Sequence, residues 1–104
     1  MYHQEITPLS QQVTITTDAP VALMPLVESA IRSELRMLDL GLDRTRQRLR
    51  LFERQYALTS EEFAPRFATG EIAESLDFIE WAGEIMTYQL LKVRRRALQE
   101  AQLS

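Results

Sequence analysis

The chain of 104 residues contains no cysteine and a single histidine, His3. Without thiols it can form no disulfide, hold no metal through thiolates and perform no cysteine chemistry. The Ser, Thr and Tyr hydroxyls have no histidine or placed lysine to activate them. The Glu-x-x-His pattern of di-metal helical bundles is also missing. We therefore expect a protein that is not an enzyme, binds no metal and needs no cofactor.

Long hydrophobic runs are also missing, because Arg and Glu interrupt every apolar stretch. The first residues, MYHQEITPLSQQ, have neither the basic start nor the apolar run of a signal peptide. The net charge of -3 gives no overall attraction to nucleic acid or anionic membranes. With 45% hydrophobic and 26% charged residues, the composition is that of one globular domain. We expect a soluble, cytoplasmic protein that does not bind membranes.

The N-terminal region, residues 1–19, differs from the rest of the chain. Val13 and Ile15 alternate with threonines, which is a short strand signal. A single strand needs a partner, so this region is either a short paired strand or an extended arm lying on helices. Asp18 and Pro20 mark a break. We assign residues 20–104 to a helical hairpin domain.

A long helix is predicted from about Val21 to Tyr56. Its apolar residues are spaced alternately by four and three, as in a helix that packs along its length on another helix. With Thr45 filling one gap, these residues are Ile31, Leu35, Leu38, Leu42, Leu49, Phe52 and Tyr56. Gly41 lies within this run and predicts a bend or a close helix crossing.

A short connecting element follows. Thr59 and Glu62 have the spacing of a capping box. Pro65 disfavours a regular helix, so we expect the element to be short and partly 3₁₀. Gly70 stands where the residue after a helix C-cap belongs.

The last helix is predicted to begin after Ser75 as N-cap. One apolar stripe, with spacings of four and three, contains Ile79, Gly83, Met86, Leu90, Val93 and Ala97. Other apolar residues cover the neighbouring sides, so the helix needs more than one packing partner. We therefore expect an all-α antiparallel hairpin of two long helices with a short connecting helix. The excess apolar surface predicts a dimeric four-helix bundle or a different protein partner.

Nine residues form the predicted interface. They are Phe78, Trp81, Ile85, Tyr88, Leu91, Leu38, Leu42, Leu49 and Phe52. Trp81 and Tyr88 share a helix face and are either a protein-binding hot spot or part of an aromatic core. The two interpretations merge if the core is itself a subunit interface.

Two basic runs allow a further interpretation. The first spans Arg44 to Arg54 and the second Lys92 to Arg96. They could form a nucleic-acid surface, but an antiparallel hairpin sets the first run opposite Asp77, Glu80 and Glu84, and Arg94 to Arg96 of the second opposite Glu28 and Glu34. This match favours pairing within the bundle.

The connecting region and the start of the last helix contain a series of short motifs. They are Thr59-Ser60-Glu61-Glu62-Phe63, Arg66-Phe67, Gly70-Glu71, Asp77-Phe78 and Glu80-Trp81, and the series ends at Tyr88. This pattern resembles that of a family of small uncharacterised prokaryotic proteins. The resemblance covers roughly residues 44 to 92, and Pro65 departs from the family's pattern. Some members are antitoxin-like halves of toxin–antitoxin pairs, so the resemblance implies a toxin-like protein partner and no catalytic residue.

Together these features predict a non-catalytic protein-interaction module, antitoxin-like, that covers a partner protein with amphipathic helices. The alternative is a homodimeric structural or regulatory bundle without a toxin partner. A nucleic-acid binder that uses the Arg runs is the third possibility.

Overall fold

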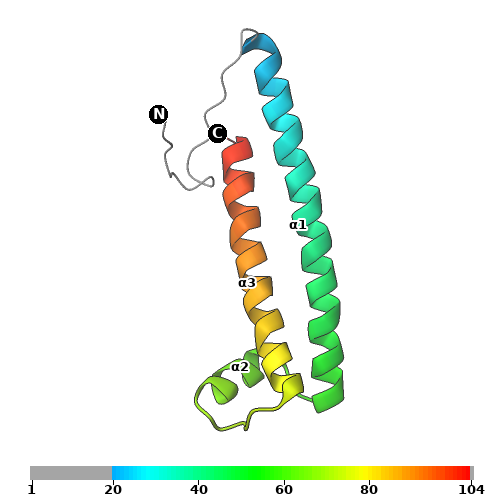
Figure 1. Ribbon diagram of the computed structural model, residues 1–104, viewed down its shortest axis with the longest axis vertical. Helices are drawn as coiled ribbons and strands as arrows, with labels where there is room; N and C mark the ends of the chain where they lie inside the picture. The colour runs from blue at the N-terminus through cyan, green and yellow to red at the C-terminus, as the bar shows by residue number, and fades with distance from the viewer. Residues whose placement is uncertain (1–19, 104) are drawn as a thin grey trace, which may run out of the picture.

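The computed structural model describes residues 20–103 of the chain. They form three helices, α1 (Pro20–Tyr56), α2 (Ser60–Ala68) and α3 (Leu76–Leu103). Figure 1 shows α1 and α3 side by side and antiparallel, with α2 beside the end where the chain turns. The predicted all-α hairpin with a short connecting helix is therefore confirmed for this part of the chain. The predicted arm or strand at residues 1–19 lies outside the described residues.

The end of α1 is determined by local backbone geometry. Ala57 adopts a left-handed conformation with φ 53°, which breaks the helical repeat. The Leu58 N–H then donates to the Glu53 carbonyl at 3.2 Å, the bond that closes a Schellman-type C-terminus. Alanine is an unfavourable residue in this conformation because its Cβ approaches the following carbonyl.

The helix α2 is capped as predicted. The Glu62 N–H donates to Thr59 Oγ1 at 3.0 Å, and the Thr59 N–H donates to Glu62 Oε1 at 3.3 Å. Gly70 has a φ of 82°, as the residue after the C-cap requires. The expectation of partial 3₁₀ structure was wrong, because α2 is α-helical throughout despite Pro65. A proline removes only one donor from the helix, and both ends of α2 are capped.

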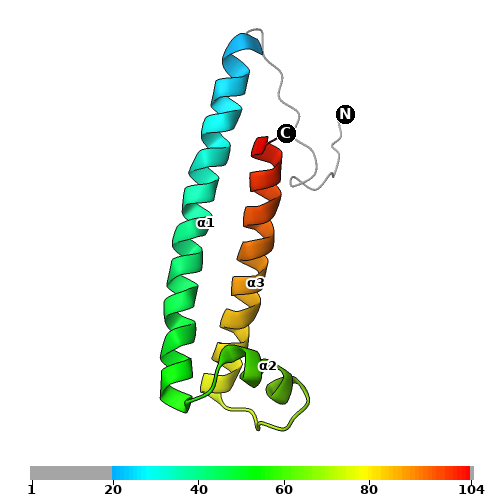
Figure 2. The same ribbon diagram turned by 180° about the vertical axis from the view of Figure 1, so that it is seen from behind.

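The start of α3 also follows the prediction. The Phe78 N–H donates to Ser75 Oγ at 3.1 Å, and the Ile79 N–H donates to the Ser75 carbonyl at 2.9 Å. Ser75 is therefore the N-cap of α3. As Figure 2 shows from behind, α3 then runs back along α1 but ends before it reaches the N-terminal end of α1.

The contact between α1 and α3 has a narrow buried seam. Leu38, Leu42, Thr45 and Leu49 on α1 are each no more than 8% exposed. Gly41 lies where the two helices approach closely, since a Cβ placed there would be 3.3 Å from Leu91 Cδ1. The described structure measures 58 × 29 × 21 Å. Such an elongated hairpin buries one side of each long helix and leaves the others exposed.

The core is widest at the closed end, where α2 covers α1 and α3. Phe63 and Trp81 are both fully buried, and their rings stack at 3.9 Å between centroids with planes 4° apart. Phe52 stacks on the indole of Trp81 at 5.6 Å, and Phe78 packs at an angle to Phe63. This aromatic cluster fixes α2 against the hairpin.

Candidate protein-interaction surface

One apolar face of α3 is left uncovered by the other residues that the structure describes. We call it the outer stripe, and it consists of Ile79, Gly83, Met86, Leu90, Val93 and Ala97. The exposed fractions of its four large residues are 51% for Ile79, 73% for Met86, 54% for Leu90 and 65% for Val93. Trp81, Glu84, Leu91 and Arg95 of the same helix contact α1 or α2. The outer stripe lies on the side of α3 that faces away from α1.

The middle of the outer stripe is hollowed. Gly83, Met86, Leu90 and Val93, together with neighbouring residues, line a shallow apolar groove of about 720 Å³. A Cβ added at Gly83 would meet no atom within 4 Å, so the glycine leaves open space rather than accommodating a neighbour in the chain. An exposed apolar groove of this kind is typical of a surface that receives side chains from another helix.

The nine residues predicted to form the interface lie elsewhere. Leu38, Leu42, Leu49 and Trp81 are buried, and Phe52, Phe78, Ile85, Tyr88 and Leu91 are half-buried. Most of them pack in the aromatic cluster, and Leu91 packs on Gly41. The structure thus brings all nine together inside one hairpin. The buried position of Trp81 agrees with its interpretation as part of an aromatic core.

Sequence reasoning missed the polar contacts that hold α2 in place. The Trp81 Nε1–H donates to Ser60 Oγ at 3.0 Å, and both residues are buried. The Ser60 N–H donates to Glu53 Oε2 at 2.8 Å, which ties α2 to α1. Serine follows the N-cap Thr59, but no local pattern indicates that its hydroxyl accepts a bond from a residue 21 positions away.

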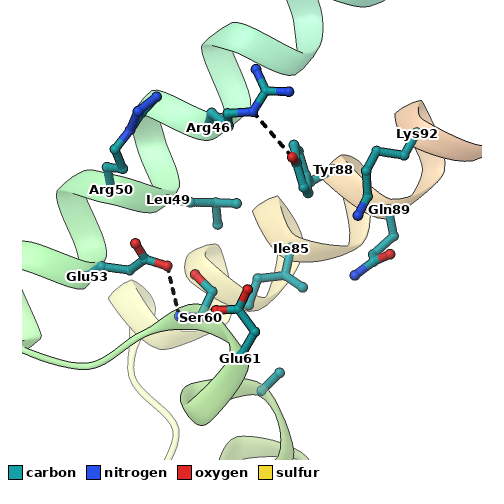
Figure 3. A pocket seen from close by; sticks show the side chains of 11 residues that line it. Arg46, Leu49, Arg50, Glu53, Ser60, Glu61, Ile85, Tyr88, Gln89 and Lys92 are labelled. Carbon is teal, nitrogen blue, oxygen red and sulfur yellow. Dashed lines mark hydrogen bonds between the residues drawn. The ribbon is translucent and has the colours of Figure 1, made fainter. Parts of the chain in front are cut away.

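A pocket of about 320 Å³ lies where the three helices meet (Figure 3). Leu49, Ala64 and Ile85 supply its apolar lining. Its charged residues have both signs, and they are Arg46, Arg50, Lys92, Glu53 and Glu61. Two of these charged residues link helices, because Glu53 accepts the Ser60 N–H bond and Arg46 donates to Tyr88.

Tyr88 lies between two cations at one edge of this pocket. Arg46 Nε donates to Tyr88 Oη at 3.3 Å, and its guanidinium carbon is 5.6 Å from the ring centroid. Lys92 Nζ is 4.8 Å from the same centroid. The hydrogen bond to Tyr88, supported by the nearby Asp43 carboxylate, raises the pKa of Arg46 above its ordinary value. The tyrosine hydroxyl acts here as an acceptor that positions α1 on α3.

The pairing of the basic runs is only partly as predicted. Arg48 meets Glu84 at 3.1 Å, in agreement with the antiparallel arrangement. Arg95 pairs with Asp39 at 2.5 Å rather than with Glu28 or Glu34, which was the expectation. The register of the two helices sets Gly41 against Leu91 and so brings Asp39 to Arg95, while α1, with 37 residues against 28 in α3, extends beyond the end of α3 (Figure 1).

Several charged side chains have no hydrogen bond or ion pair within residues 20–103. On α1 these include Arg44, Arg50 and Arg54, and on α3 they include Glu80 and Arg94. The first three are on exposed positions of α1. Glu80 and Arg94 flank the outer stripe, because each lies one residue after a stripe position. Both are available to an external partner.

Among the described residues, no three acidic or histidine side chains gather into a group that could hold a metal ion. None of the three helices is long and apolar enough to cross a membrane. Comparison of the chain with protein-family models, with curated proteins and with solved structures gives no match.

Proposed function

We propose that the protein is a non-catalytic protein-interaction module and that the outer stripe of α3 docks against a second copy of the chain. The observation that supports this proposal is the exposure of four large apolar side chains, from 51% at Ile79 to 73% at Met86. They share one helix face at the spacing that helix pairs use. In such a dimer the two α3 helices lie in the middle and each α1 lies outside.

The energy available from this stripe is of the right size for a reversible dimer. Fully burying a Val, Leu, Ile or Met side chain contributes about 1.5–3 kcal/mol, so covering the exposed half of each contributes roughly 1 kcal/mol. Four such side chains in each copy give on the order of 8–10 kcal/mol. Association costs about 4–15 kcal/mol in lost freedom. The two terms are comparable, so we expect a dimer whose population depends on protein concentration.

Light scattering coupled to size-exclusion chromatography tests the proposal. The full chain should elute as a dimer at about 10–100 micromolar, a range that suits a complex of moderate affinity. The double variant Met86→Glu/Leu90→Glu should be a monomer. A matched control is Met37→Glu/Leu40→Glu, which changes two α1 residues that are 62% and 60% exposed.

The control should remain a dimer, because Met37 and Leu40 lie outside the outer stripe. A wild-type monomer throughout this range would refute the proposal. Equal loss of dimer in both double variants would show that added charge, rather than the outer stripe, determines the result. Circular dichroism of each variant checks that the hairpin is still folded.

The second candidate is the antitoxin-like role, in which the module covers a toxin-like protein. The observation that favours it is the part of α1 that extends beyond α3 (Figures 1 and 2). Met24 and Leu26 on this part are 58% and 67% exposed, and a dimer through α3 does not cover them. An amphipathic helix with such an overhang is suited to lie in a partner's groove.

Co-expression with the product of a neighbouring gene, followed by purification on a tag placed on this chain, tests this role. A toxin-like partner should co-purify, and Met24→Glu/Leu26→Glu should release it while the dimer persists. Co-purification that survives this double variant, or that is lost only with Met86→Glu, would assign the partner to another surface.

A further inference from the structure

We infer that two copies of the chain pair antiparallel through the outer stripes of α3, in one register that the side chains of the stripe and its flanks determine. This inference rests on the proposed function, in which the outer stripe docks a second copy. It adds the direction of pairing, the residues that oppose each other and the charges that select the partner.

The sizes of the stripe residues favour the antiparallel direction. With the symmetry axis level with Tyr88, the apolar layers are Ile79 opposite the partner's Ala97, Gly83 opposite the partner's Val93, and Met86 opposite the partner's Leu90. Each small residue then faces a larger one, and the open space at Gly83 receives a valine. A parallel pair would set Gly83 against Gly83 and leave an empty layer, which well-packed helix pairs avoid.

The unpaired charges favour the same direction. Glu80 and Arg94 follow stripe residues by one position, so they lie on the same flank of the stripe. In the antiparallel register the same flanks of the two helices meet, so the flank neighbour of Glu80 is the partner's Arg94, which is offset by two residues from the level of Glu80, and symmetry repeats this pair. A parallel pair sets Glu80 near the partner's Ser75 and Arg94 near the partner's Gln89, neither of which is charged. Opposite charges at flanking positions are a known determinant of partner choice in helix pairs.

Cysteine cross-linking tests the direction, because the chain has no cysteine of its own. The variant Ile79→Cys/Ala97→Cys should form a covalent dimer under mild oxidation. The two positions are about 27 Å apart along one helix at 1.5 Å per residue, so they cannot bridge within a chain. Ile79→Cys alone and Ala97→Cys alone should give little covalent dimer. Efficient cross-linking of either single variant would indicate a parallel pair and overturn the inference.

Charge exchange tests the register independently. Glu80→Arg and Arg94→Glu should each raise the dissociation constant of the dimer about tenfold, since two symmetric pairs become repulsive. The double variant Glu80→Arg/Arg94→Glu should return it to within about twofold of the wild type. Arg96→Glu is the matched control, because Arg96 lies on the other flank of the stripe, where its neighbour is the partner's uncharged Ala82, and it should change the constant by less than about threefold.

The outcomes separate the inference from the proposed function. A wild-type monomer would refute both. A dimer that Met86→Glu/Leu90→Glu dissociates, but that neither cross-links through residues 79 and 97 nor recovers in the charge exchange, would refute the antiparallel register alone. Recovery in the charge exchange together with the double-cysteine cross-link would support it.

Discussion

The bond between Ser60 and Trp81 should contribute measurably to stability. Trp81 is fully buried in the aromatic cluster, with 0% of its surface accessible to solvent. Its Nε1–H donates to Ser60 Oγ at 3.0 Å. Ser60→Ala removes the acceptor and leaves a buried N–H unpaired. We expect the free energy of unfolding to fall by about 1–3 kcal/mol, which is the cost of desolvating such a group.

A double-mutant cycle separates the bond from other effects. Trp81→Phe removes the donor while keeping an aromatic ring that can stack on Phe63, so in its background Ser60→Ala should cost less than about 0.5 kcal/mol. The difference between the two backgrounds is the coupling energy. Ser33→Ala, an exposed change on α1, is the control and should stay within about 0.5 kcal/mol.

Urea denaturation followed by far-ultraviolet circular dichroism provides the measurement, since Trp81 is the sole tryptophan and fluorescence would be lost in the variant. All proteins should be compared at one concentration, because a dimer makes apparent stability depend on concentration. A cost of Ser60→Ala that is the same in both backgrounds would refute the reasoning. It would mean that Ser60 stabilises the protein through its place in α2 and not through its bond to the Trp81 indole.

Other parts of the structure give further expected outcomes. Thr59→Ala should lower the free energy of unfolding by about 1 kcal/mol in chemical denaturation, because it removes half of the capping box; no change would show that α2 does not depend on its cap. Ala57→Gly should raise stability by up to about 1 kcal/mol, since glycine accepts the left-handed backbone without strain; a lower melting temperature would contradict this. The hydrogen bond to Asp77, aided by burial, raises the pKa of Tyr56. The folded protein therefore favours the neutral phenol of Tyr56. The stabilisation that its hydrogen bond gives the fold is present below pH ~10 and is lost as pH rises further. Melting temperatures above pH ~10 should fall more steeply for the wild type than for Tyr56→Phe. Fluorescence-anisotropy titration with duplex DNA and RNA should detect no binding near physiological salt, and salt-sensitive micromolar binding that Arg50→Glu abolishes would favour a nucleic-acid function.

Local signals in the sequence predicted the boundaries of the helices well. Thr59 with Glu62, Ser75 and Gly70 each act on backbone groups within a few residues of themselves, so a pattern of residue types is enough to locate them. The predicted start of α1 differs from the observed start at Pro20 by one residue. The ends of α2 were thus predicted, but its expected partial 3₁₀ character was wrong, because Pro65 disturbs a helix with two good caps less than expected.

Contacts between distant residues could not be predicted in the same way. The sequence shows that Arg95 is basic and that Asp39 and Glu34 are acidic, but a shift of one or two turns between antiparallel helices changes which of them meet. The shift is determined by the packing of Leu91 on Gly41 and of Trp81 beneath α2. The same packing leaves Arg44 without a partner among the described residues, contrary to a simple matching of charge runs.

The two apolar sides of α3 show why the candidate surface followed from the fold and not from periodicity alone. Both sides repeat at four and three residues, so either could face α1. Trp81 and Tyr88 occupy one side and need partners for their polar atoms, which Ser60 and Arg46 provide inside the hairpin. The other side has only aliphatic residues, methionine and glycine, and the described part of the chain offers just one other long helix, α1. The nine-residue α2 is too short to cover the 28-residue α3 along its length. No helix within residues 20–103 therefore covers the outer stripe, which supports the proposal that a helix from another molecule docks there.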